Sequence, residues 1–300
     1  MVNLNYHIYS LVAVFLALGI GALVGISIQG GPGGSAAIEQ QTRQIQKLQE
    51  QFKTQEERMG VQRALIERLH SGLKESDALA ARALPVVTAN QLSGRGVAIV
   101  QFGAADQLTR QVVSALESAG ASLTTTTNMD LEYGLEIPEQ MEKAARLTPM
   151  EFQDSAKEPY QHFWGYLASV IAGGKQGNPL EQFTSAGILR GDGDYTRPNR
   201  FVVLVIPGSE DPKKLMDLYV RPLSDKLKQN NINLALVTNT LGTELEDRSE
   251  NPWLQIDLPT VTHIDYAFGQ ISLVSALLDG KGHYGLGPSE EILPKRVTAP

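Results

Sequence analysis

The chain of 300 residues is long enough for one or two domains with buried cores. Its formal net charge of -7 argues against nucleic acid as the principal partner, because phosphate binding relies on clustered Lys and Arg. The absence of cysteine excludes disulfides, CxxC redox chemistry and thiolate metal sites.

The first predicted element is a helix over residues 8–28, which carries no charged side chain. At about 1.5 Å per residue it would span about 30 Å, the hydrocarbon thickness of a bilayer. A cleaved secretory signal would have a basic residue ahead of a shorter apolar run, and no Lys or Arg precedes this one. The pattern therefore favours a retained membrane anchor over a removed signal.

Charge does not orient this helix in the membrane. The first charged residue of the chain is Glu39, so the excess of Lys and Arg that marks cytoplasmic flanks is missing. With about seven residues ahead of the helix, the simplest topology leaves the N-terminus inside and carries the rest of the chain across. We therefore expect a single-pass protein of the cell membrane, with the bulk of the chain outside the cytoplasm.

Small residues recur at intervals of four along the predicted anchor. They are Ala13, Ala17, Gly21 and Gly25. Such residues lie on one stripe of a helix, where small side chains allow two membrane helices to approach closely. Gly and Ala are also common in membrane helices that do not pair. Four positions in register nevertheless favour a helix-pairing face.

A stalk is predicted after a short joint. Residues 29–35, QGGPGGS, interrupt the helix because proline lacks the amide donor and glycine costs backbone entropy. Residues 36–83 are rich in good helix formers and carry an apolar side chain at every seventh position. This row, the predicted coiled-coil seam, consists of Ile38, Ile45, Phe52, Met59, Ile66, Leu73 and Ala80.

The seam favours a parallel dimeric coiled coil, in which a strict seven-residue repeat winds two helices into a left-handed supercoil. The companion row consists of the positions three residues after each seam residue. It is weaker, because only Leu48 and Leu69 are large and apolar there and Gln occupies most other positions. The alternative is one long amphipathic helix that packs on its own domain. Gly60 and Gly72 are the positions where the helix is expected to bend or break.

The rest of the chain alternates apolar strands with helices. LPVV at residues 84–87 is expected to end the stalk. A strand over 97–102, a helix over 105–119 and a strand over 121–129 form one β-α-β unit. A second unit follows at residues 200–239, in which Asp211 caps the helix. This alternation predicts an α/β domain with a Rossmann-like, mostly parallel sheet covered on both faces.

The predicted organisation therefore has three parts. Residues 1–35 form the transmembrane anchor and its joint, residues 36–84 the coiled-coil stalk, and residues 85–300 the α/β domain. Within that domain GDGDYTRPN, residues 191–199, is expected to be a loop, and its DGD a solvated turn more than a calcium ligand set.

Motifs for catalysis and for cofactors are absent from the sequence. There is no GxxxxGK[ST], GxSxG or HExxH. Ligands of open α/β sheets bind beyond the carboxyl ends of the strands. The turn there, QFGAADQ, has one glycine where the dinucleotide fingerprint has three, and GSEDP after the second unit's first strand has two acids. We predict no enzyme and no catalytic or cofactor-binding residue; a small-ligand enzyme ranks third among the interpretations.

Two stretches resemble a known family. NLNYHIYSLVAVFLALGIGALVG, followed by a Gln/Glu-rich coil, and THIDYAFGQISLVSALLDGKGHYG near the C-terminus are similar to the MctB-like copper transporter family of actinobacterial and related envelopes. The resemblance covers nearly the whole chain. It implies a role in copper homeostasis, and copper enters through the resemblance alone. Within the C-terminal stretch, His263 and His283 are the candidates for a metal or ligand contact; the alternative is that they fill the sheet edge.

Two functions follow from these observations. The first is a membrane-anchored envelope protein of copper homeostasis or efflux that acts as a homodimer, paired through its membrane helix and coiled coil, with partners. A single helix cannot enclose a pore, so transport would need oligomers or other proteins. The alternative is a non-enzymatic bitopic scaffold that recruits envelope or cell-division proteins through its stalk and α/β head.

Overall fold

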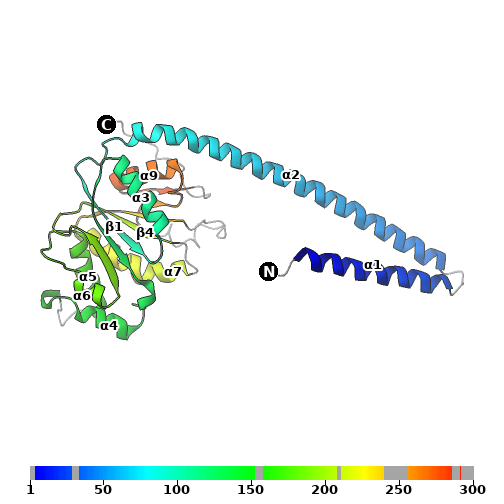
Figure 1. Cartoon of the computed structure of the whole chain (residues 1–300), viewed down its shortest axis with the longest axis horizontal. Helices are drawn as coiled ribbons and strands as arrows, with labels where there is room; N and C mark the ends of the chain where they lie inside the picture. Colours follow the sequence, from blue (N-terminus) through cyan, green and yellow to red (C-terminus); the bar gives the residue numbers. More distant parts are fainter. Residues whose placement is uncertain are drawn as a thin grey trace. The chain divides into compact units, whose positions relative to one another are not determined.

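The computed structural model describes residues 4–28, 34–152, 158–207, 211–239, 256–285 and 291. Contacts divide the chain into two compact units, Met1–Leu73 and Lys74–Pro300. The first unit holds helix α1 (Leu4–Ile28) and most of helix α2 (Gly34–Thr88), and the second holds the end of α2 and the α/β domain (Figure 1).

Helix α1 covers the segment that the sequence predicts as a membrane anchor. Within the described parts of the chain, however, no helix has the length and apolar character needed to cross a membrane. The predicted transmembrane anchor is therefore not confirmed. Of the predicted joint, residues 29–33 lie outside the described residues.

Helix α2 is a single helix of 55 residues, which confirms the long predicted helix. It differs from the expectation in two ways: it is unbroken at Gly60 and Gly72, and it continues through Pro85 to Thr88 instead of ending at residue 84. Proline removes one backbone hydrogen bond so close to the end. The hydroxyl of Thr88 donates to the Leu84 carbonyl at 2.8 Å, and the Gln91 side-chain amide donates to the Val87 carbonyl at 2.5 Å. These bonds satisfy carbonyls of the last turns.

The α/β domain is built on a seven-stranded sheet of order β3-β2-β1-β4-β5-β6-β7. Neighbouring strands are parallel except for β2 and β3, which confirms the predicted mostly parallel sheet. The central strands β1 and β4 are apolar and almost wholly buried, as a sheet covered on both faces requires. The strands are β1 (Gly96–Phe102), β2 (Ser122–Met129), β3 (Leu189–Gly193), β4 (Phe201–Ile206), β5 (Asn233–Thr238), β6 (Thr260–Val261) and β7 (His283–Tyr284).

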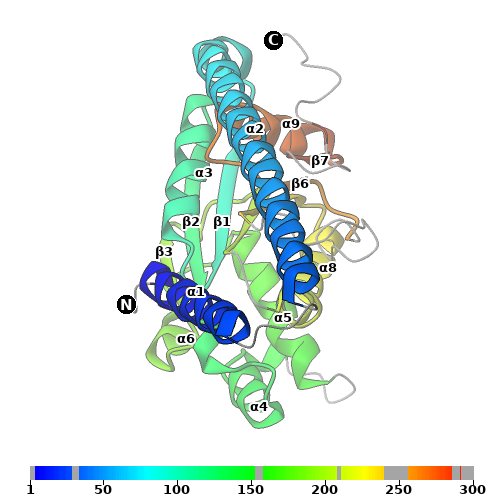
Figure 2. The same ribbon diagram turned by 90° about the vertical axis from the view of Figure 1, so that its right-hand side faces the viewer.

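Helices cover both faces of the sheet (Figures 1 and 2). One face packs against α3 (Asp106–Ser118) and α9 (Ala267–Asp279). The other packs mainly against α5 (Pro159–Ile171) and α8 (Arg221–Gln229). Its remaining elements are η1 (Leu131–Tyr133), α4 (Pro138–Arg146), η2 (Met150–Phe152), α6 (Glu181–Ser185), α7 (Pro212–Leu215) and the π-helical turn η3 (Met216–Val220).

Local sequence signals explain several of these elements. Asp211 precedes α7, and its carboxylate accepts a hydrogen bond from the Lys214 amide at 2.9 Å, as the predicted cap requires. The prediction of a loop over residues 191–199 was wrong at its start, because Gly191–Gly193 belong to edge strand β3. Asp194 forms a turn beyond this strand: its carboxylate accepts a hydrogen bond from the Thr196 amide at 3.0 Å.

Candidate functional site

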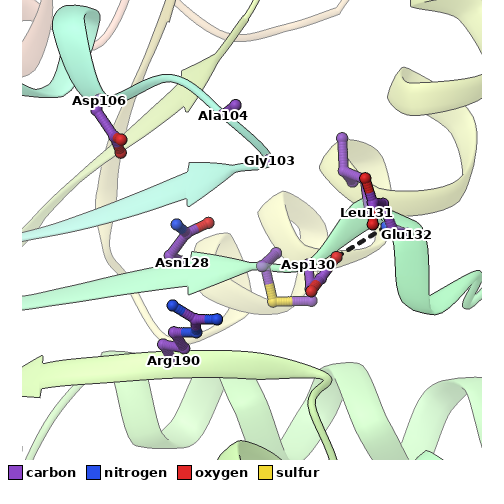
Figure 3. Close-up of a pocket in the computed structure, with 9 residues that line it drawn as sticks. Gly103, Ala104, Asp106, Asn128, Asp130, Leu131, Glu132 and Arg190 are labelled. Atoms are coloured by element: carbon purple, nitrogen blue, oxygen red, sulfur yellow. Dashed lines mark hydrogen bonds between the residues drawn. The ribbon is translucent and has the colours of Figure 1, made fainter.

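A pocket of about 460 Å³ opens at the carboxyl ends of β1 and β2 (Figure 3). This is the edge at which open α/β sheets bind their ligands. Three segments contribute to it: the turn from β1 into α3, the end of β2 with the start of η1, and edge strand β3. The lining consists of Gly103, Ala104, Asp106, Asn128, Met129, Asp130, Leu131, Glu132 and Arg190.

The turn after β1 is held by a buried polar network. Gln101 is the last residue but one of the mostly apolar strand β1 and is 3% exposed. Its amide donates to the Asp106 carboxylate at 2.8 Å and to the Gly103 carbonyl at 2.9 Å, and its side-chain oxygen accepts from the Thr109 hydroxyl at 2.6 Å. Gly103 adopts φ 61°, a left-handed conformation that favours glycine. The network satisfies Gln101 and fixes the Asp106 carboxylate at the first turn of α3.

The opposite wall of the pocket comes from β2, η1 and β3. Asn128 and Arg190 are direct partners in the antiparallel β2–β3 register, and Figure 3 shows the Asn128 side chain on the β1 side of β2 and the Arg190 side chain between β3 and β2. The Asp130 carboxylate accepts a hydrogen bond from the Glu132 amide at 2.9 Å. Three carboxylates and one guanidinium therefore surround the space. Arg190 makes no ion pair with any residue that the structure describes.

This set of side chains is suited to binding. The described residues of the lining include no histidine, cysteine, serine or threonine, so any proton transfer or nucleophilic attack there would fall to the carboxylates of Asp106, Asp130 and Glu132. Arg190 presents a bidentate donor fork that matches a carboxylate, and the acids match ammonium or hydroxyl donors. Sequence reasoning located this edge of the sheet but missed Asn128, Asp130 and Arg190; the acids directly after the β2 pattern were the available signal.

The two candidate metal ligands lie at the far end of the sheet, separated from the pocket by β4 and β5. His263 follows β6, is 6% exposed, and its Nδ1 lies 2.8 Å from the Thr262 hydroxyl. His283 begins β7 and pairs with Thr260, three residues before His263.

Aromatic rings surround His263. Its ring centroid lies 6.0 Å from that of Tyr266 and 6.4 Å from that of Phe268. Across the described residues, no group of three or more His, Cys, Asp or Glu side chains could hold a metal ion. The role of His263 and His283 as metal ligands stays a prediction.

The stalk carries a second candidate surface. The large apolar side chains of the seam and its companion row are between 45% and 71% exposed at Ile45, Leu48, Phe52, Met59, Ile66 and Leu69. Leu73 is half-buried, and the side chain of Ile38 lies outside the described residues. A continuous row of exposed apolar side chains on one helix marks an interaction surface.

The predicted helix-pairing face of α1 is exposed in the described structure. The small residues Ala13 and Ala17 are exposed, and a side chain added at Gly21 or Gly25 would meet no atom within 4 Å. Pairing through this face stays a prediction.

Fold and site together define a class of protein: a Rossmann-like α/β domain with a polar binding pocket, carried at the end of a long helix. Comparison with protein families is more specific. The family model described as copper transport outer membrane protein, MctB, matches residues 1–294, so the chain belongs to the MctB family. This confirms the resemblance read from the sequence. No curated protein matches the chain.

Proposed function

We propose that this chain is a non-enzymatic, membrane-attached protein of the cell envelope that acts in copper homeostasis or efflux as a homodimer. The observation that carries the proposal is family membership over residues 1–294. A role in binding fits the described lining of the pocket, whose charged groups are three carboxylates and Arg190.

Attachment to the membrane is proposed through α1. The supporting observation is that no residue before Glu39 carries a charged side chain. In this proposal α1 crosses the membrane once, pairs through its small residues, and leaves α2 and the α/β domain outside the cytoplasm. A single helix has no internal channel, so copper movement would require a second copy or another envelope protein.

The alternative is a bitopic scaffold that recruits envelope or cell-division proteins through its stalk and head. Two observations favour it: the exposed apolar seam on α2, and the lack of a group of metal-ligating side chains within the described residues. In this case copper homeostasis would depend on the recruited protein, and the chain itself would bind no copper.

Copper tolerance of cells lacking the chain tests the proposal. We expect deletion to lower the copper concentration that halves growth, and the wild-type chain to restore it. His263→Gln and His283→Gln test direct handling of the metal, and His70→Gln on the exposed side of α2 is the matched control. Equal tolerance of deleted and parent cells would contradict the copper role. A division defect in those same cells would favour the scaffold.

A further inference from the structure

The end of α2 is fixed to the α/β domain at two places. The Asp77 carboxylate accepts a hydrogen bond from the amide of Ala267, the first residue of α9, at 2.6 Å. Helix α9 has no side-chain cap of its own at its N-terminus, so Asp77 supplies one from another helix. After α2, the Leu92 amide donates to the Ala119 carbonyl at the end of α3, and Thr88 and Leu92 are buried.

The half-buried positions near the end of α2 continue the exposed seam. Residues three, four and seven positions apart share one side of a helix. Leu73, Asp77, Ala80 and Leu84 follow this spacing and are half-buried, whereas the residues between them on the other sides are mostly exposed. Leu73 and Ala80 also belong to the seven-residue row of the seam, which continues towards the N-terminus from Ile66.

We propose that this face of α2 makes two different contacts along its length. Over residues 45–69 it packs against a second copy of the chain, and from Asp77 onward it packs against the chain's own α/β domain. The partner changes at Gly72 and Leu73. Gly72 is exposed, and a side chain added there would meet no atom within 4 Å. The inference rests on the homodimer of the proposed function, and it states where along α2 the dimer interface ends.

A second copy fits the face better than an unrelated partner. A strict seven-residue repeat presents the same seam to a like helix over several turns. The six exposed side chains of each chain would each bury roughly 100 Å², or roughly 1,200 Å² for the pair, which reaches the lower limit of a specific interface. Gln55 and Gln62 of the companion row would face their own copies in a parallel, in-register pair, and polar core layers of this kind fix register.

The sequence contains no cysteine, so a single introduced cysteine can report whether its position on α2 lies in the dimer interface. The variants are Ile45→Cys and Ile66→Cys on the proposed interface, Ala80→Cys on the same row beyond Leu73, and Ala64→Cys on the opposite, exposed side of α2 as the control. Each full-length chain is treated with a short bismaleimide in its native membrane, and the covalent dimer is quantified. We expect cross-linking at residues 45 and 66 at least tenfold above residue 64, and none above that control at residue 80.

A double variant tests why residue 80 does not cross-link: because the α/β domain covers it, or because no second copy reaches it. Asp77→Ala combined with Ala80→Cys releases the end of α2 from α9, and we expect cross-linking at residue 80 to rise above the single variant. Cross-linking at residue 80 as strong as at residue 66 in the single variant would overturn the proposed limit while leaving the dimer intact. No cross-linking at residues 45 and 66 would overturn the dimer itself, whatever the copper phenotype.

Discussion

At the scale of single residues, Glu136 joins two elements of the α/β domain. Its carboxylate accepts hydrogen bonds from the Lys214 ammonium and the Tyr219 hydroxyl, both at 2.9 Å. The bond from Lys214 holds the pKa of Glu136 below its usual 4.5. Burial and, next, the hydrogen bond to Glu136 raise the pKa of the Tyr219 phenol, so Tyr219 stays a donor at neutral pH.

Glu136→Gln tests this cluster. We expect a loss of up to about 1 kcal/mol in the free energy of unfolding at pH 7, because the glutamine oxygen can still accept from Tyr219 but without the charge that strengthens this partly buried bond, and exposed ion pairs contribute little. Because the pKa of Glu136 is lowered by folding, its contribution is complete above 4.5 and is lost as pH falls through the lowered value. Urea unfolding at neutral and acid pH should therefore show the difference between wild type and variant shrink in acid.

The matched control for this prediction is Glu142→Gln, which breaks an exposed pair with Arg146 one helical turn away. It should leave the free energy of unfolding unchanged within error. A loss as large as that of Glu136→Gln would show that surface charge, and not the Tyr219 bond, sets the effect.

Asp77 is the residue that holds α2 to α9. Asp77→Ala removes the acceptor of the Ala267 amide and should cost about 1 kcal/mol, as the loss of a helix cap does. Hydrogen exchange should report the change as faster exchange at the start of α9. Asp77→Asn retains a side-chain oxygen and should restore most of the protection. Equal exchange in all three chains would contradict a capping role.

The pocket shows what sequence reasoning could not reach at this scale. Apolar runs identify β1 and β2, and hence the edge where a ligand would bind. They do not reveal that Arg190 lies opposite Asn128, because that register depends on an edge strand distant in the chain. The lining is therefore known only once β3 is placed.

At the scale of elements, periodicity predicted the elements with strong signals and missed the weak ones. The buried strands β1, β4 and β5 are apolar along most of their length, and the seven-residue row marks α2. Strand β3 was missed because glycine and aspartate are typical of turns. Strands β6 and β7 have two residues each, too few for any pattern. The end of α2 was placed too early because α2 includes Pro85 and continues to Thr88, where a proline usually ends a helix.

Charge beside the seam gives a prediction for α2. In a parallel, in-register pair, Arg58 of one chain would face Arg63 of the other, five positions further along. Arg63→Glu would replace this repulsion by attraction and should tighten the dimer by about 0.5 kcal/mol for each of the two contacts. Sedimentation equilibrium of the detergent-solubilised chain measures the change. Weaker association in Arg63→Glu would contradict the parallel arrangement, because an antiparallel pair would bring Arg63 towards Glu56 instead.

At the scale of the whole molecule, the family assignment could be reached from the sequence, and the fold of the α/β domain agreed with its prediction. A metal site could not be derived from the sequence, because its histidines are scattered. Within the described residues, no group of three or more His, Cys, Asp or Glu side chains could hold a metal ion. In the proposed function, what the chain does depends on how copies assemble, because α2 exposes a row of apolar side chains that water does not favour.

The mass of the full-length chain in detergent, measured by light scattering with the detergent contribution subtracted, tests the central claim most directly. A second copy on the seam predicts about twice the chain mass of 32.6 kDa for the wild type. Phe52→Glu places a charge in the centre of the seam and should raise the share of single chains above that of the wild type, although α1 can still pair, while Ala64→Glu on the opposite side should not change the dimer. A wild-type mass of one chain, or a Phe52→Glu mass equal to that of the wild type, would contradict the account.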